Sequence, residues 1–140
     1  MELTINDALL LGAEKHKEGN LEEAQRLYRA ILDADPLHPD ANHNLGLLAI
    51  GANRADLALP LFKRALGANS SVVQYWLSYI DALITHKQFQ NARTVLEEGK
   101  KQGVFGAAYD DFNKRLASIF SLADKYSESQ IKEVTANVGH

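Results

Sequence analysis

The chain has 140 residues, 46% of them hydrophobic and 24% charged, which is the composition of an ordinary soluble globular protein of one domain. Its formal net charge of −3 argues against nucleic acid or an anionic membrane as the main partner, because both carry dense negative charge themselves. The chain contains no cysteine, which excludes disulfides, thiol catalysis and thiolate metal sites.

Apolar spacing and helix-end residues predict six helices that pair as three hairpins. In the first turn, Gly19 ends one helix, and Asn20 with Glu23 forms an N-cap followed by a carboxylate three residues later. Pro36 closes the first hairpin because proline cannot continue a helix, whereas Pro60 falls inside a helix, where it removes one backbone hydrogen bond and can introduce a kink. The predicted helices cover residues 5–17 and 21–34, 39–50 and 55–66, and 72–86 and 89–102.

A further helix is predicted at residues 107–123, after a break that begins at Gly103. Its apolar residues recur every four positions on one helical face, and this face can cover the open end of the third hairpin. The polar tail from residue 124 carries Ile131 and Val134, so it forms either a short amphipathic helix or a linker. The expected division is a repeat domain at 1–123, with repeats at 5–38, 39–72 and 73–106 and a capping helix at 107–123, then a tail at 124–140.

Equivalent residues return at intervals of 34 positions. They are the glycines Gly12 and Gly46, the alanines Ala24, Ala58 and Ala92, and the large residues Tyr28, Phe62 and Leu96. Small residues suit positions where paired helices approach closely, and large ones fill the space between hairpins. A helix pair that cannot bury its apolar stripe alone must stack against its neighbours, so the period predicts a solenoid.

This pattern resembles the tetratricopeptide-repeat family over about residues 5–103. The stretches HPDANHNLG and QYWLSYIDAL are also similar to N-terminal repeat segments of bacterial multidomain proteins whose later parts are glycosyltransferases, sulfotransferases or methyltransferases. The resemblance implies an all-α, right-handed α-solenoid of about three hairpins plus a C-terminal capping helix. It also implies a scaffold or substrate-docking role without catalysis in this chain.

The resemblance further implies a peptide groove on the concave face, lined by the first helix of each hairpin. By position, the candidate peptide-binding residues are Leu9, His43, Asn44, Leu47, Ile50, Leu77, Asp81 and Ile84. One subtype of the family binds chaperone C-terminal carboxylates with lysines, asparagines and an arginine. The matching positions here are Leu9, Ala13, Asn44, Gln74 and Ser78, which lack the cations, so that ligand is rejected. The aliphatic strip suits an amphipathic helix or an extended peptide, unless these leucines belong to the core.

The search for reactive chemistry points away from an enzyme. The histidines have no metal-ligand spacing, and His38 and His43 do not share a helical face. Paired carboxylates are adjacent in sequence and therefore diverge on a helix. No glycine-rich phosphate loop or GxSxG serine occurs. We therefore expect no cofactor and no metal.

The expected function is a cytoplasmic, non-catalytic scaffold that binds a protein or peptide in the concave groove. The alternative is an N-terminal segment of a larger glycosyltransferase or sulfotransferase that docks the acceptor protein. Self-association, through the groove or through the tail near Ile131 and Val134, is a third hypothesis.

Overall fold

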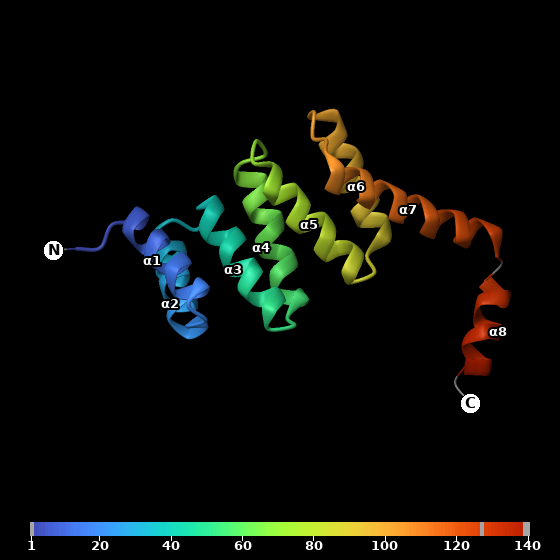
Figure 1. The fold of residues 1–140 in the computed structure, drawn as a ribbon, viewed down its shortest axis with the longest axis horizontal. Helices are drawn as coiled ribbons and strands as arrows, with labels where there is room; N and C mark the ends of the chain where they lie inside the picture. Colours follow the sequence, from blue (N-terminus) through green and yellow to red (C-terminus); the bar gives the residue numbers. More distant parts are fainter. Residues whose placement is uncertain (1, 127, 139–140) are drawn as a thin grey trace.

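The computed structural model describes residues 2–126 and 128–138, and the regular secondary structure within them is helical. Successive helix pairs stack side by side along one axis, with the two chain ends at opposite ends of the molecule (Figure 1). The predicted all-α solenoid of three hairpins and a C-terminal covering helix is confirmed. The helices are α1 (Ile5–Lys17), α2 (Leu21–Ala34), α3 (Pro39–Gly51), α4 (Ala55–Ala68), α5 (Val73–Thr85), α6 (Phe89–Lys101), α7 (Ala107–Lys125) and α8 (Glu128–Val138).

The predicted helix ends agree with the structure to within two residues. Helix α4 continues through Pro60, which lies inside the helix as predicted. The division into a repeat domain at 1–123 and a tail at 124–140 stays a prediction, and residues 1, 127, 139 and 140 lie outside the described part of the chain. No helix within that part is long and apolar enough to cross a lipid bilayer.

The turn inside each hairpin contains one residue with a left-handed backbone. These residues are Gly19, Asn53 and Lys87, with φ of 84°, 59° and 62°, and they lie 34 positions apart. In the first turn, the Gly19 N–H donates to the His16 carbonyl (3.0 Å) and the Asn20 N–H to the Lys15 carbonyl (2.9 Å). The same two-bond pattern recurs in the other two turns. It satisfies the last helical carbonyls, and glycine adopts it at the lowest cost.

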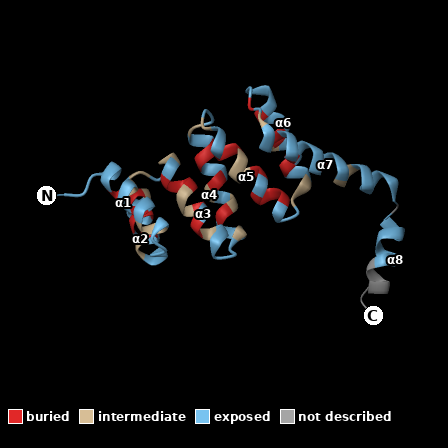
Figure 2. Ribbon diagram, in the orientation of Figure 1, coloured by how far each residue is buried: buried red, intermediate tan, exposed pale blue. Residues whose placement is uncertain are grey.

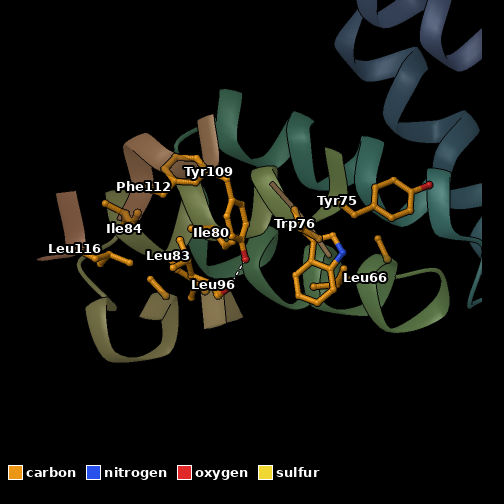
Figure 3. Close-up of a cluster of buried hydrophobic side chains, with 13 residues drawn as sticks. Leu66, Tyr75, Trp76, Ile80, Leu83, Ile84, Leu96, Tyr109, Phe112 and Leu116 are labelled. Atoms are coloured by element: carbon orange, nitrogen blue, oxygen red, sulfur yellow. Dashed lines mark hydrogen bonds between the residues drawn. The ribbon is translucent and has the colours of Figure 1, made fainter. Parts of the chain in front are cut away.

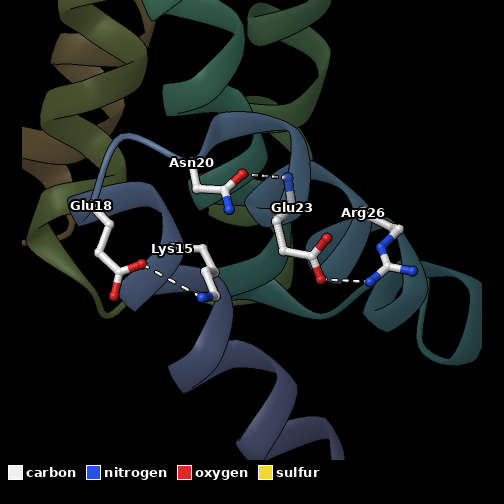
Figure 4. A network of polar contacts seen from close by, with 5 residues as sticks. All are labelled: Lys15, Glu18, Asn20, Glu23 and Arg26. Atoms are coloured by element: carbon white, nitrogen blue, oxygen red, sulfur yellow. Dashed lines mark hydrogen bonds and ion pairs between the residues drawn. The ribbon is translucent and has the colours of Figure 1, made fainter.

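The start of α2 forms the predicted N-cap in part (Figure 4). The Asn20 side-chain oxygen accepts a hydrogen bond from the Glu23 N–H (3.4 Å). The Glu23 carboxylate, however, accepts from the Arg26 guanidinium (2.5 Å), one turn further along the helix. A second exposed ion pair, Lys15–Glu18 (3.5 Å), lies beside the same turn.

Replacing Lys87 by glycine is expected to stabilise the protein. A left-handed backbone costs a residue with a Cβ about 1–2 kcal/mol, while the flexibility of glycine in the unfolded chain costs about 0.5–1 kcal/mol. The balance favours Lys87→Gly by about 0.5–1 kcal/mol in the free energy of unfolding, measured by urea denaturation. Lys63→Gly, inside α4, is the matched control and should lose about 1 kcal/mol. A loss of stability in Lys87→Gly as large as in this control would contradict the left-handed assignment.

The 34-residue pattern of glycines and aromatic residues reflects direct contacts between paired helices. A Cβ added at Gly12 would lie 2.6 Å from Cε1 of Tyr28, and one added at Gly46 would lie 2.5 Å from Cε1 of Phe62. Both rings are fully buried. The ring of the second helix therefore lies directly on the backbone of the first, which only glycine permits.

The third hairpin and α7 share the largest core cluster (Figure 3). Gly99 of α6 faces the Tyr109 hydroxyl of α7 and the Trp76 ring of α5. The Tyr109 hydroxyl donates a hydrogen bond to the Leu96 carbonyl, and burial raises the pKa of Tyr109 to about 12. Phe112 and Leu116 of α7 complete this cluster. The later part of α7 and the described side chains of α8 are exposed (Figure 2).

Candidate peptide-binding surfaces

The predicted concave site consists of residues on α1, α3 and α5, and these residues differ widely in exposure. Leu47, Ile50 and Asp81 are exposed; Leu9, Asn44 and Leu77 are half-buried; His43 and Ile84 are buried. Leu9 packs against the core of the first hairpin, and Leu77 packs against the core shared by the third hairpin and α7. The open aliphatic part of the predicted groove is therefore centred on Leu47 and Ile50 of α3.

Ile84 does not lie on an open groove, in contrast to the sequence-based expectation. Its side chain is 4% exposed and belongs to the same core cluster as Phe112 and Leu116 of α7 (Figure 3). Ile50, which lies 34 residues earlier at the equivalent position, is 41% exposed. The difference arises because α7 packs against α5 and covers Ile84, so no surface is left there for a partner.

His43 also differs from its predicted place at the border of the groove, because it is buried between α3 and α5. Its Nε2 lies 2.8 Å from the Ser78 hydroxyl, and its ring centroid lies 4.9 Å from that of Tyr75. Burial lowers the pKa of His43 and so favours the neutral imidazole, although a hydrogen bond to Asn44 and the negative charge of Asp40 act in the opposite direction. The residue connects two helices rather than facing a ligand.

A second polar contact joins the same two helices. The Tyr75 hydroxyl of α5 donates to the Asp40 carboxylate of α3. Within α5, the Gln74 amide donates to the Ser78 hydroxyl (3.2 Å) and so orients the partner of His43. The partners His43–Ser78 and Asp40–Tyr75 are each 35 residues apart, one more than the repeat. The 34-residue period predicted that neighbouring hairpins stack, but it does not identify these pairs. Together they hold α3 against α5.

A cleft on the other side of the stack was not predicted. It lies between α2 and α4 over α3 and has a volume of about 640 Å³. We call it the convex cleft. Its apolar lining is Leu21 of α2, Leu45, Leu48 and Ala49 of α3, Ala52 directly after α3, and Leu57, Pro60 and Leu61 of α4. Leu57 and Leu61, on either side of Pro60, could have indicated this cleft from the sequence. They lie outside the 34-residue pattern, which marks the other face of the helix.

The geometry defines a stacked helical-repeat protein with two surfaces open to other molecules. A family model described as tetratricopeptide repeat matches residues 9–71 and 43–103, which together cover more than half of the chain. The chain therefore belongs to the tetratricopeptide-repeat family. The comparison with curated proteins found no match.

Solved structures share the fold at low sequence identity. PilF from Pseudomonas aeruginosa is 22% identical with a TM-score of 0.71, over 87% of this chain and 56% of PilF. A mutant O-GlcNAc transferase from Thermobaculum terrenum is 24% identical with a TM-score of 0.62, over 69% of this chain and 19% of the transferase. The first repeat domain of Spaghetti (RPAP3), solved with an HSP90 peptide, is 18% identical with a TM-score of 0.72, over 86% of this chain and 98% of that domain. The chain thus spans about half of PilF and a fifth of the transferase.

Proposed function

We propose that this chain is a non-catalytic scaffold that binds a peptide or an amphipathic helix of another protein on its concave face. The observation that carries this proposal is that Leu47 and Ile50 are exposed aliphatic side chains on α3, the inner helix of the central hairpin. Half-buried Leu9 and Leu77 extend the strip to the neighbouring inner helices. Aliphatic anchors of a ligand would bury this surface, which is the hydrophobic contribution to binding.

The charges beside the strip indicate which charge the ligand carries. Asp40 and Asp81 are exposed on α3 and α5, and they favour a ligand with a lysine or arginine beside its aliphatic anchors. The HSP90 peptide bound to Spaghetti (RPAP3) is SRMEEVD, which is acidic at its end. The positions that match the carboxylate-binding residues of the chaperone-binding subtype are Leu9, Ala13, Asn44, Gln74 and Ser78, and none of them carries a positive charge, so the ligand of this chain has a different chemistry.

The burial of Ile84 supports an amphipathic helix as the ligand form. At the C-terminal end of the stack, α7 covers an inner helix of the repeat array with Phe112 and Leu116. An equivalent aliphatic position on α3, Ile50, has no such cover in the described structure and is 41% exposed. A helix from a partner would bury Ile50 in the way that α7 buries Ile84.

Leu47→Asp is expected to abolish partner capture without unfolding the chain. A carboxylate in the centre of the apolar strip must be desolvated without a partner when the ligand binds, whereas in the unbound protein it remains in water. The measurement is affinity capture from the source organism's lysate, with identification of bound proteins and a circular-dichroism melt of each variant. Leu10→Asp, on an exposed position of α1, is the matched control. Capture of the same proteins by Leu47→Asp as by the unchanged chain would refute the concave site.

A second candidate function is acceptor docking for a glycosyltransferase or sulfotransferase, as part of a longer protein. The similarity to a fifth of an O-GlcNAc transferase favours it. The length of the native reading frame separates the two proposals, because the second requires a catalytic domain after the repeats.

A further inference from the structure

The convex cleft is apolar along its length and charged at its ends. Arg29 of α2 and Arg64 of α4 lie at one end. Helices α2 and α4 are the second helices of successive hairpins, and the two arginines are 35 residues apart, one more than the repeat, so they lie at nearly the same height along these helices. Glu22, Arg54 and Asp56 lie at the other end, near the helix starts. The two ends therefore differ in charge.

The charges at the two ends are also paired differently. At the helix starts, Arg54 and Asp56 form a two-bond ion pair (3.0 and 2.9 Å). At the far end, Arg64 donates to the Asn42 amide oxygen (3.3 Å). The Gln25 amide oxygen, oriented toward Arg29, accepts from that guanidinium (3.0 and 3.2 Å). Among the described residues, these two arginines thus bind neutral amides, and an incoming carboxylate would find two positive charges beside leucines.

Helix α8 carries the matching chemistry at the opposite end of the molecule (Figure 1). Ile131 and Val134 lie one turn apart on the helix, and their side chains are 48% and 63% exposed. Glu128 lies three residues before Ile131 and shares its face, whereas Glu133 points to the other side of the helix. One face of α8 thus presents a carboxylate followed by two aliphatic side chains, with Lys132, one turn after Glu128, at the edge of this face.

We propose that α8 of one molecule docks in the convex cleft of a second copy. Ile131 and Val134 enter between the leucines of α2 and α4, and Glu128 pairs with Arg29 and Arg64. The dimensions agree, since Leu21 to Arg29 spans about 12 Å along α2 and Glu128 to Val134 about 9 Å along α8, at 1.5 Å rise per residue. In this orientation α8 runs antiparallel to α2 and α4.

The arrangement is head-to-tail. The convex cleft is lined by α2, α3 and α4. Helix α8 lies beyond α7 at the far end of the molecule, so it is distant from these helices of its own chain (Figure 1). A heterologous contact of this kind propagates into a ring or an open filament. Two aliphatic side chains and one ion pair make a small interface, so association is weak and depends on protein concentration. This surface is separate from the concave site, and either proposal can fail without the other.

Sedimentation velocity of the full chain over a range of concentrations tests the charge pairing. The weight-average sedimentation coefficient is expected to rise with concentration in the unchanged protein. Glu128→Lys should weaken association at least about tenfold, which corresponds to about 1.4 kcal/mol, because it removes the carboxylate that pairs with Arg29 and Arg64 and places a positive charge beside them. Glu133→Lys makes the same charge change on the other face of α8 and should leave association unchanged. The triple variant R29E/R64E/E128K should regain the association that R29E/R64E loses.

Apolar variants test the location of the contact. Ile131→Asp and, on the cleft side, Leu57→Asp should each abolish the concentration dependence while the circular-dichroism melt stays unchanged. Leu57→Asp also lies outside the concave face, so it should leave partner capture intact. An unchanged protein that remains monomeric at about millimolar concentration would overturn the proposal, because its dissociation constant would then be too weak for a specific contact. Association that persists in Ile131→Asp, or equal effects of Glu128→Lys and Glu133→Lys, would overturn it as well.

Discussion

Trp76→Ala is expected to lower the free energy of unfolding by about 3–5 kcal/mol, since truncation of a buried tryptophan removes its apolar contacts and leaves a cavity. Trp76 is 2% exposed and lies in the cluster that joins α5, α6 and α7 to Leu66 of α4 (Figure 3). Its indole N–H also donates to the Ser70 carbonyl (2.8 Å). The ring therefore supports both the third hairpin and its stacking on the second, and no other side chain in the described structure replaces it.

Urea denaturation followed by circular dichroism measures this loss, because Trp76 is the single tryptophan and its fluorescence disappears with it. Trp76→Phe keeps an aromatic ring but not the hydrogen bond, so it should lose clearly less stability than Trp76→Ala. Leu122→Ala, on the exposed end of α7, is the surface control, and its effect should stay within about 0.5 kcal/mol. A loss below about 1 kcal/mol in Trp76→Ala would show that the ring is not part of a close-packed core.

Phe62→Ala should lower the free energy of unfolding by a similar amount. It should also reverse the effect of a second substitution, Gly46→Ala, from destabilising to stabilising. In the unchanged protein, Gly46→Ala gains about 1 kcal/mol of helix propensity but forces a Cβ to within 2.5 Å of the Phe62 ring. Overpacking of this kind costs about 1–3 kcal/mol, so Gly46→Ala alone should be destabilising. In the Phe62→Ala background the ring is absent, and the added methyl group should stabilise the helix and fill part of the cavity.

A double-mutant cycle of Gly46→Ala and Phe62→Ala measures this coupling from urea-denaturation free energies. The expected interaction energy is about 2 kcal/mol, at the upper range for residues in direct contact. Gly67→Ala is the matched control. Gly67 lies in α4, and a Cβ added there would have no atom of another helix within 4 Å. It should be mildly stabilising in both backgrounds. Independent effects of Gly46→Ala and Phe62→Ala would contradict the contact that explains the 34-residue pattern.

The sequence by itself determined the helices, the repeat and the small residues at which paired helices approach closely. It placed Tyr28 and Phe62 between hairpins, whereas their rings also lie against Gly12 and Gly46 within a hairpin. These features depend on residues close in the chain: Gly19 ends α1, and Gly46 meets Phe62 across one short turn. Helical spacing places such residues on a known face, and a helix must bury its apolar face somewhere. The left-handed turns at Asn53 and Lys87 were not predicted, because neither residue type requires that conformation.

Only the tertiary structure decided which of those faces remain open. Ile50 and Ile84 occupy equivalent positions, yet α7 buries one and leaves the other exposed. His43 is buried and joins α3 to α5, because the Ser78 hydroxyl, 35 residues later, lies within hydrogen-bonding distance of its ring. The convex cleft exists because α2 and α4 stand apart over α3. Periodicity assigns a residue to a face of its own helix, but the exposure of that face depends on how neighbouring helices pack in three dimensions.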